Sequence, residues 1–242
     1  MDIIGAVALI AYYLIVLGML PMLVKHFFTI PNEYIRKIQH IAYGLSIFIL
    51  LHLFSQWYMA AGAAFLWVLF VYPALVLIEK TSFFKQSFVG RKKEKSELRK
   101  QLLFVQLSFA ILIFVFWGLL GPNWKFVAVG AVMVWAFGDA AAALVGKFLG
   151  RLTFFHQLIE KAKTFEGTMA MSIASGLVLF LILLLYARLP WLPSLLISTV
   201  VGPACAIVEL FSKRGLDTLT IPFTAAILIF ALVHLFGLFW VF

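Results

Sequence analysis

The chain consists mostly of apolar runs that are each about as long as a lipid bilayer is thick. Eight such runs lie in its 242 residues, at 3–24, 38–55, 58–79, 101–121, 124–146, 168–188, 191–211 and 220–241. A helix needs about 20 residues to cross the hydrocarbon core, and all of its backbone groups must then be hydrogen-bonded within the protein. The sequence therefore predicts an all-α, polytopic transmembrane helix bundle in which residues 1–242 form a single domain.

The composition excludes a water-soluble globular protein. Hydrophobic residues make up 64% of the chain and charged residues only 12%, whereas about a quarter of the residues of a soluble domain are charged. The number of spans stays open at two places, because the run 38–55 is short and Pro203 interrupts the run 191–211. Seven spans and one re-entrant segment would fit the same pattern.

The positive charges alternate between the two sides of this topology. The connections 25–37, 80–100, 147–167 and 212–219 hold 3, 8, 4 and 2 of the 19 Lys and Arg residues, whereas the opposite connections hold only Lys125 and Arg188. Because positive residues gather on the cytoplasmic side, both chain ends are expected outside. The basic run 91–95 lacks interleaved aromatic residues, so we expect it to lie against anionic lipid headgroups and not to bind nucleic acid.

Two carboxylates, Asp139 and Glu209, lie within or at the end of apolar runs. Ionisable groups at such positions are costly and usually have a function, although either acid could instead pair with a lysine or cap a helix. Asp139 shares one helical face with Ala143, Gly146 and Gly150. This nearly bare face would let a neighbouring helix or a phosphate approach the backbone closely.

The segment 161–168 supplies a second set of polar groups just before an apolar run. Lys161 and Lys163 would balance the charge of a polyphosphate, and Thr164 and Thr168 would donate hydrogen bonds to it. Glu166 would bind Mg²⁺ shared with the substrate phosphates, and Gly167 would let the backbone come close to them. The alternative is an ordinary helix start capped by Thr164. No P-loop sequence is present anywhere in the chain.

Two further clusters lie on the same predicted side of the membrane. One follows the seventh run and contains Glu209, Lys213, Arg214 and Asp217; it would otherwise be a plain positive loop. The other consists of four residues on one stripe of a helix that enters the membrane, namely Glu33, Arg36, Lys37 and His40. His40 would bind a hydroxyl or phosphate, or else serve only in packing.

Four strings together resemble the dolichol kinase and phytol kinase family, which includes CTP-dependent diacylglycerol kinases. Residues 33–40 resemble its E-x-x-R-K-x-x-H motif, and residues 139–150 resemble its D-x-x-A-x-x-x-G-x-x-x-G motif. Residues 163–168 match K-T-x-E-G-T, and residues 215–222 resemble G-L-D-N-L-T-x-P with Thr218 in place of the usual Asn. The nucleotide-site motifs are thus concentrated in residues 139–222.

The resemblance implies a kinase that transfers the terminal phosphate of CTP, or of another NTP, to a lipid alcohol at the cytoplasmic membrane surface. Phytol, farnesol, a polyprenol of the dolichol type and diacylglycerol all remain possible acceptors. Asp139 and Glu166 would bind Mg²⁺, and Lys161, Lys163, Lys213 and Arg214 would contact phosphates. Asp217 or Glu209 would orient or deprotonate the alcohol, and the cluster of Glu33, Arg36, Lys37 and His40 would contact the substrate.

Two other functions compete with this expectation. The motifs are distantly similar to those of phosphatidate cytidylyltransferases, which make CDP-lipids, but the H-G-G-x-x-D-R string that would complete their signature is missing. A transporter would need polar groups at mid-depth or on both sides of the membrane. The oligomeric state is left open by the sequence.

Overall fold

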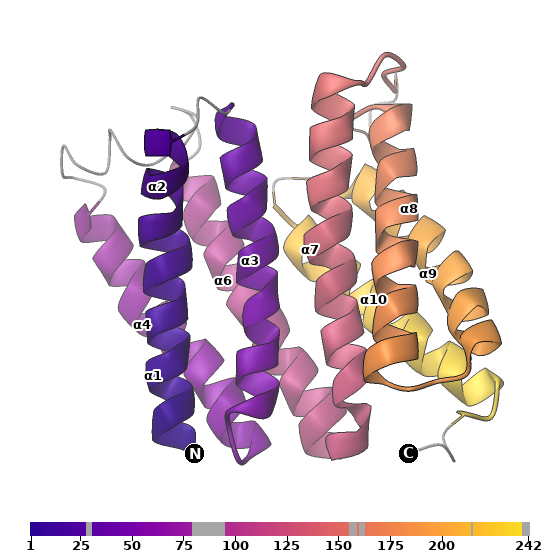
Figure 1. Ribbon diagram of the computed structural model, residues 1–242, viewed down its shortest axis with the longest axis horizontal. Helices are drawn as coiled ribbons and strands as arrows, with labels where there is room; N and C mark the ends of the chain where they lie inside the picture. Colours follow the sequence, from indigo (N-terminus) through magenta and orange to yellow (C-terminus); the bar gives the residue numbers. More distant parts are fainter. Residues whose placement is uncertain (28–30, 79–94, 155–158, 160–162, 214, 239–242) are drawn as a thin grey trace.

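The protein is a bundle of long helices. The computed structural model describes residues 1–27, 31–78, 95–154, 159, 163–213 and 215–238 (Figure 1). The α-helices are α1 (Asp2–Tyr13), α2 (Leu20–Phe27), α3 (Asn32–His52), α4 (Trp57–Ile78), α6 (Lys95–Ile113), α7 (Lys125–Phe148), α8 (Phe165–Leu181), α9 (Trp191–Phe211) and α10 (Asp217–Leu235). π-Helical segments at Leu14–Met19, Phe114–Leu119 and Ile182–Tyr186 join α1 to α2 and extend α6 and α8. The predicted all-α fold is confirmed for this part of the chain.

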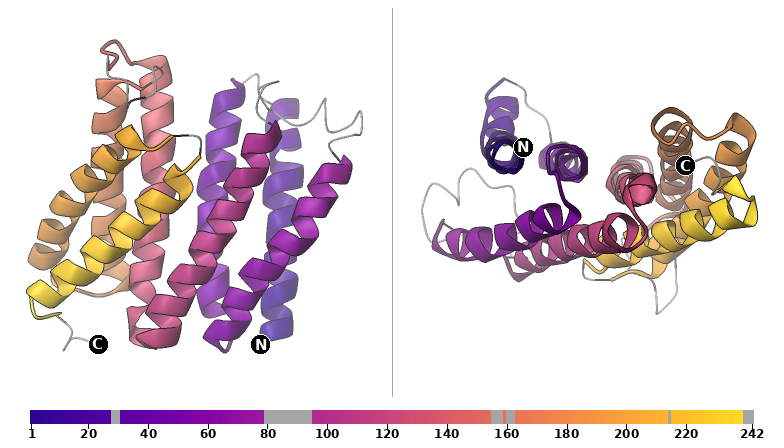
Figure 2. Two further views of the ribbon diagram at one scale, coloured as in Figure 1. Left: turned by 180° about the vertical axis from the view of Figure 1, so that it is seen from behind. Right: turned by 90° about the horizontal axis from the view of Figure 1, so that it is seen from below.

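The helices form two rows that pack against each other. Seen end-on, α1, α3, α7 and α8 follow one another in the first row, and α4, α6 and α10 lie in the second (Figure 2). Helix α9 packs against both α8 and α10. Helix α7 lies at the centre, because 78% of its apolar 18-residue stretch is buried, whereas only 22% of the corresponding stretch that begins with α8 is buried.

Five of the described helices are long and apolar enough to cross a membrane: Leu102–Leu119, Pro122–Phe148, Phe165–Tyr186, Trp191–Phe211 and Asp217–Leu235. Helix α9 runs without a break through Pro203. The outward face of α8 exposes Met169, Ile173, Leu177 and Leu181 at helical spacing. Such a continuous apolar stripe requires lipid rather than water as its solvent, so the molecule is a membrane protein.

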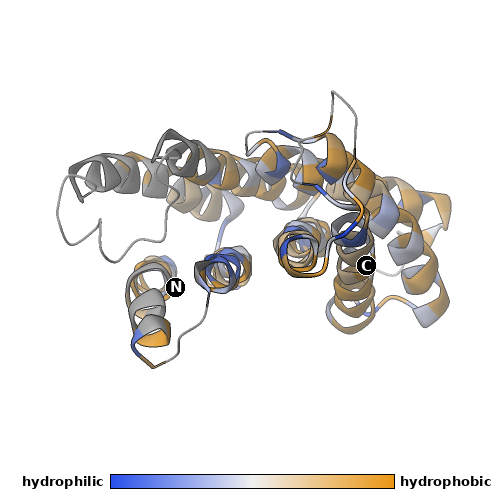
Figure 3. Ribbon diagram, turned by 90° about the horizontal axis from the view of Figure 1, so that it is seen from above, coloured by the Kyte–Doolittle hydropathy of each residue, from blue (hydrophilic) through white to orange (hydrophobic). Residues whose placement is uncertain are grey.

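The direction of the helices brings the polar sequence motifs to one end of the bundle. Helices α3, α8 and α10 begin at this end, and α7 and α9 finish there (Figure 1). Seen from this end, hydrophilic residues gather on α3 and α7 (Figure 3). Lys125, at the start of α7, lies at the opposite end, where its Nζ donates a 2.8 Å hydrogen bond to the carbonyl oxygen of Leu51. The motifs thus meet because of the up-and-down order of the helices.

Close helix contacts lead to a first testable prediction. A Cβ atom at Gly202 in α9 would lie 2.6 Å from the carbonyl oxygen of Ser172 in α8, whereas a Cβ at Gly62 would meet nothing within 4 Å. We expect Gly202→Ala to lower the free energy of unfolding by about 1–3 kcal/mol, because α8 and α9 must separate. Gly62→Ala is the matched control and should be neutral or stabilising by up to about 1 kcal/mol. Thermal unfolding of the two purified variants in one detergent measures the difference, and equal stabilities would contradict it.

Candidate active site

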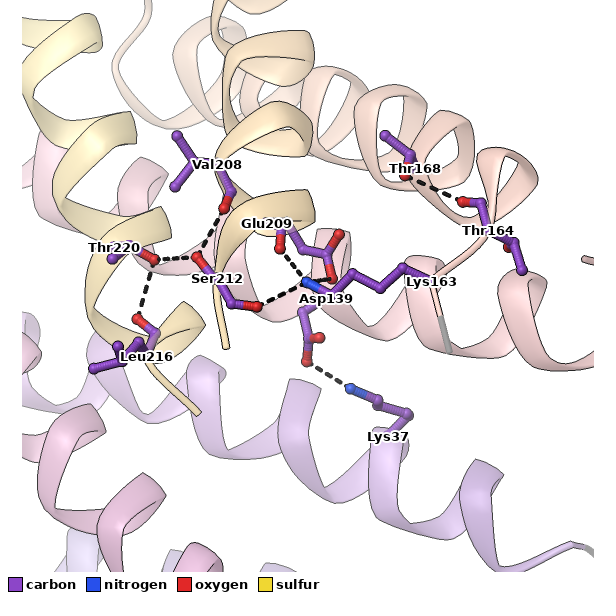
Figure 4. A network of polar contacts seen from close by, with 10 residues as sticks. All are labelled: Lys37, Asp139, Lys163, Thr164, Thr168, Val208, Glu209, Ser212, Leu216 and Thr220. Carbon is purple, nitrogen blue, oxygen red and sulfur yellow. Dashed lines mark hydrogen bonds and ion pairs between the residues drawn. The ribbon is translucent and has the colours of Figure 1, made fainter. Parts of the chain in front are cut away.

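The centre of the polar end is Asp139, a buried carboxylate on α7. Lys37 on α3 donates a 2.6 Å hydrogen bond from Nζ to Asp139 Oδ2, and His40 Nε2 lies 3.2 Å from the same oxygen. Lys37 and His40 are three residues apart on α3, so they share one face of that helix. The Lys37 side chain is only 4% exposed. The expected alternative of pairing with a lysine is therefore realised for Asp139 (Figure 4), which leaves open whether the acid also has a chemical role.

Lys163 lies on the other side of Asp139 and joins the start of α8 to the end of α9. Its Nζ forms a 2.9 Å ion pair with Glu209 Oε1 and donates hydrogen bonds to the carbonyl oxygens of Glu209 and Ser212, the latter at 3.0 Å. The final carbonyls of a helix carry partial negative charge and attract cations. Glu209 is therefore also paired with a lysine (Figure 4). Two ammonium groups and two carboxylates, from α3, α7, the segment just before α8, and α9, thus lie together.

Asp217 begins α10 next to this cluster. The turn before it passes through Gly215, whose φ of 82° favours glycine, and Thr218 Oγ1 donates a 2.7 Å hydrogen bond to the Gly215 carbonyl oxygen. Oδ1 of Asp217 is buried and has no hydrogen-bond partner. Buried polar atoms are nearly always paired, so this oxygen is available to a cation or to a hydroxyl group.

The start of α8 is a capped helix, as one alternative from the sequence predicted. Thr164 Oγ1 accepts a 3.1 Å hydrogen bond from the Gly167 amide, and Thr168 Oγ1 donates one of 3.1 Å to the Thr164 carbonyl oxygen. Glu166 accepts hydrogen bonds from the Arg151 and Leu152 amides at 3.0 and 3.2 Å. Its carboxylate thereby fixes the loop that precedes α8. Its expected role as a magnesium ligand stays a prediction.

The glycines of this region make a close contact between α7 and α8. A Cβ at Gly146 would lie 3.0 Å from Thr164 Oγ1, and one at Gly167 would lie 2.8 Å from the Ala142 carbonyl oxygen. A Cβ at Gly150 would collide with the Gly146 carbonyl oxygen and Thr164. The stripe therefore lets two helices approach each other, and contact of these glycines with a nucleotide stays a prediction.

Glu33 forms the rim of the site at the start of α3. It is paired with Arg36 on the same helix and with Lys147 Nζ on α7 at 3.3 Å. Burial raises the pKa of Glu33, but the hydrogen bonds and charges of Arg36 and Lys147 outweigh burial and hold it below 4.5. The rim thus links α3 to α7 above Asp139.

This pairing predicts a small, pH-dependent contribution to stability. A carboxylate whose pKa is lower in the folded state stabilises the protein above its unfolded pKa, and the effect disappears as the pH falls through the folded pKa. Since the Arg36 and Lys147 side chains are 45% and 49% exposed, we expect Glu33→Gln to lower the free energy of unfolding by less than about 1 kcal/mol at pH 7. Thermal unfolding should show the difference from the unchanged chain at pH 7 and its loss as the pH falls through the lowered pKa of Glu33 in the folded state. A difference that grows in acid would contradict this assignment.

Two of the expected phosphate contacts, Lys161 and Arg214, lie outside the described residues. Lys213 is half-buried just after α9. Of the remaining predicted residues, the structure brings Lys37, His40, Asp139, Lys163 and Glu209 together. Glu166 instead points to its own loop.

Sequence reasoning missed Trp135. Its indole packs against the His40 imidazole with 4.2 Å between ring centroids, and its Nε1 is buried without a hydrogen-bond partner. The available signal was its position, four residues before Asp139 and therefore on the same face of α7. A tryptophan in an apolar run carries no charge that would mark it as part of a site.

The donor atoms at this end fit a magnesium ion that is shared with a substrate. Within the ranges that the structure describes, no three His, Cys, Asp or Glu side chains form a metal-binding group. Mg²⁺ usually needs only one or two protein carboxylates, because phosphates and water complete its shell. The unpartnered Asp217 Oδ1 beside the Asp139 cluster meets this requirement.

Fold and site together define a helical membrane protein with a charged centre at one end of its bundle. This charged centre consists of Lys37, Asp139, Lys163 and Glu209. No protein-family model and no solved structure matches the chain. The chain is, however, 33% identical over 233 residues to a phytol kinase of Synechocystis sp., and the match covers 93% of this chain and 91% of that relative. The chain therefore belongs to the phytol kinase and dolichol kinase family, which confirms the resemblance seen in its motifs.

Proposed function

We propose that the protein is a lipid-alcohol kinase that transfers the terminal phosphate of CTP, or of another NTP, to the hydroxyl of an isoprenoid alcohol or diacylglycerol. One observation carries this proposal: Lys37, Asp139, Lys163 and Glu209, from distant parts of the sequence, meet at one end of a lipid-embedded bundle. The Synechocystis relative is a phytol kinase, which supports the same reaction class.

The charges of the centre suit phosphoryl transfer. This reaction needs little covalent help from the protein, because positioning and neutralisation of charge provide most of the acceleration. Lys163, together with Lys161, Lys213 and Arg214, would bind phosphate oxygens. Lys37 would hold Asp139 in place from the opposite side, as its 2.6 Å hydrogen bond indicates. When the nucleotide binds, its phosphate oxygens would thus replace the Glu209 carboxylate as the ion-pair partner of Lys163.

Magnesium is the proposed cofactor, with Asp139 and Glu166 as the expected ligands and Asp217 as a further oxygen donor. When bound, the ion would neutralise charge on the phosphate oxygens. Because the Glu166 carboxylate is bound to two backbone amides, it would have to leave them in order to reach the ion.

The acceptor alcohol is proposed to keep its apolar tail between the helices while its hydroxyl reaches the charged centre. Asp217, whose Oδ1 lacks a partner, would accept the hydroxyl proton, with Glu209 as the other candidate. A carboxylate serves as a general base when it lies within hydrogen-bond reach of the proton that it removes.

For the membrane topology we propose eight spans, both chain ends outside and the charged centre facing the cytoplasm. Five described helices of spanning length support this proposal, and α1, α3 and α4 overlap the three remaining predicted runs. The segregation of Lys and Arg to the side of the charged centre supports this orientation.

One assay tests the reaction. The purified protein is given phytol and CTP that is labelled either at the α or at the γ phosphate, and the lipid is then extracted. Label from the γ position alone is expected for the kinase. Label from the α position with release of pyrophosphate would instead establish CDP-lipid synthesis and overturn the proposal. Repeating the assay with farnesol, a polyprenol, diacylglycerol, ATP and UTP identifies both substrates.

A further inference from the structure

The first turn of α10, which bears Asp217, is not closed by the hydrogen bonds of its own helix alone. In an α-helix the N–H group of each residue donates to the carbonyl oxygen four residues earlier. Pro222 lies inside α10 and has no N–H group, so the carbonyl oxygen of Thr218 lacks this partner. Both residues are buried, in a segment long and apolar enough to cross a membrane. The carbonyl must therefore find a donor elsewhere in the protein, since lipid chains donate no hydrogen bond.

Ser108 on α6 supplies the missing hydrogen bond. Its Oγ donates to the Thr218 carbonyl oxygen at 2.8 Å, and the residue is only 1% exposed. A serine inside a helix can instead donate to the carbonyl oxygen four residues earlier in its own helix. Ser108 donates to a neighbouring helix, to a residue 110 positions away in the sequence, where the proline has left an acceptor open. The α10 turn thus depends on α6 for its closure.

The same turn is bonded to the charged centre through α9. Thr220 lies three residues after Asp217, and its Oγ1 is 2.7 Å from Ser212 Oγ at the end of α9. The Ser212 carbonyl oxygen in turn accepts the 3.0 Å hydrogen bond from Lys163 Nζ (Figure 4). The Asp217 carboxylate interacts electrostatically with Asp139 and Lys163. The turn is therefore held by α9 next to the charged centre and by α6 through Ser108.

We propose that Ser108 is a positioning residue for phosphate transfer. By closing the turn that Pro222 leaves open, it keeps the Asp217 carboxylate directed at the charged centre, where this carboxylate meets the acceptor hydroxyl. The inference rests on the proposed function and adds a residue that acts through Asp217 rather than by contact with a substrate. Without the hydrogen bond from Ser108, the Thr218 carbonyl is free to turn away from α6. Asp217 moves with it, because the two residues are consecutive in one helical turn.

The first experiment measures transfer of the γ-phosphate of CTP to phytol by Ser108→Ala. We expect kcat to fall about tenfold, because the loss of the hydrogen bond leaves a buried carbonyl unpaired and misplaces a group that contacts the reacting hydroxyl. The KM for CTP should change less than about twofold, since Lys163 and the other proposed phosphate contacts are intact. This split between kcat and KM is expected of a residue that positions Asp217.

Ser175→Ala is the matched control. Ser175 is also buried, and its Oγ donates a 3.2 Å hydrogen bond from α8 to the carbonyl oxygen of Val134 on α7. That carbonyl does not depend on the serine, because the residue four positions later is Gly138, which has an N–H group. We expect kcat of Ser175→Ala to change less than about twofold. A loss equal to that of Ser108→Ala would overturn the proposal.

Restoring the missing N–H group separates positioning from packing. Pro222→Ala gives the Thr218 carbonyl a donor within α10, so Ser108 should become dispensable. Adding Ser108→Ala to the Pro222→Ala chain should therefore lower kcat less than about twofold. A loss of about tenfold in both backgrounds would show that Ser108 serves only the packing of α6 against α10, and it would overturn the proposal.

Hydrogen exchange of the purified chains in nanodiscs tests the turn independently of the reaction. The backbone amides of residues 219–221 should exchange about tenfold faster in Ser108→Ala than in the unchanged chain. In the Pro222→Ala background, Ser108→Ala should leave their exchange unchanged. Equal exchange in Ser108→Ala and the unchanged chain would overturn the proposal, even if the protein phosphorylates phytol. Faster exchange in Ser108→Ala, together with an unchanged chain that phosphorylates no lipid alcohol, would instead overturn the proposed function.

Discussion

Replacement of Asp139 by Asn is expected to lower the rate of phosphate transfer at least about 1,000-fold. The asparagine side chain would keep the shape of the aspartate but lose the charge that faces Lys37, His40 and the proposed nucleotide phosphates. The γ-labelled CTP assay measures this loss. Activity within about tenfold of the unchanged chain would remove Asp139 from the reaction.

The same substitution is also expected to reduce stability, and this effect must be separated from catalysis. Lys37, with a side chain only 4% exposed, would lose its carboxylate partner, and breaking a buried pair from one side costs about 3–5 kcal/mol. The double variant Lys37→Met with Asp139→Asn removes both charges. It should recover most of the thermal stability while remaining inactive. Recovery of activity with stability would show that Asp139 serves only the fold.

Replacement of Lys163 by Met is expected to give the second largest effect, a loss of at least about 100-fold in kcat/KM for the nucleotide. Lys163 is the described lysine that joins α8 to the end of α9 and holds Glu209 at 2.9 Å. Its removal would take away a positive charge from the proposed phosphate site. Initial rates at varied CTP concentration measure the effect.

Lys147→Met provides the control for the loss of one lysine at the same end of the molecule. Its side chain is 49% exposed and pairs with Glu33 at the rim, so the value of kcat/KM should change less than about twofold. An equal loss in both variants would mean that overall positive charge, and not the position of Lys163, determines nucleotide use.

The sequence predicted the helices and their polar end because both follow from local patterns. Apolar runs of spanning length predict helices, and the order of the runs places every second connection on the same side. It also predicted Thr164 as a helix cap, since the residues involved are neighbours in the chain. The family was recognised from four short motifs, which the match to the Synechocystis enzyme confirms.

The partners of the charged residues could not be predicted from the sequence alone. Asp139 was expected to pair with a lysine or to act in chemistry, but the choice of Lys37, 102 residues away, depends on how α3 packs against α7. Glu166 reaches the backbone of Leu152 because residues 153 and 164 are joined by an antiparallel bridge.

The location of the charged centre at the end of a lipid-embedded bundle has a kinetic consequence for the proposed reaction. The nucleotide arrives from water, so its concentration is counted per volume, whereas the alcohol arrives from the bilayer and is counted as a mole fraction of lipid. Adding inert phospholipid at constant amounts of enzyme and alcohol should therefore slow the enzyme by surface dilution, although every bulk concentration of the two reactants is unchanged.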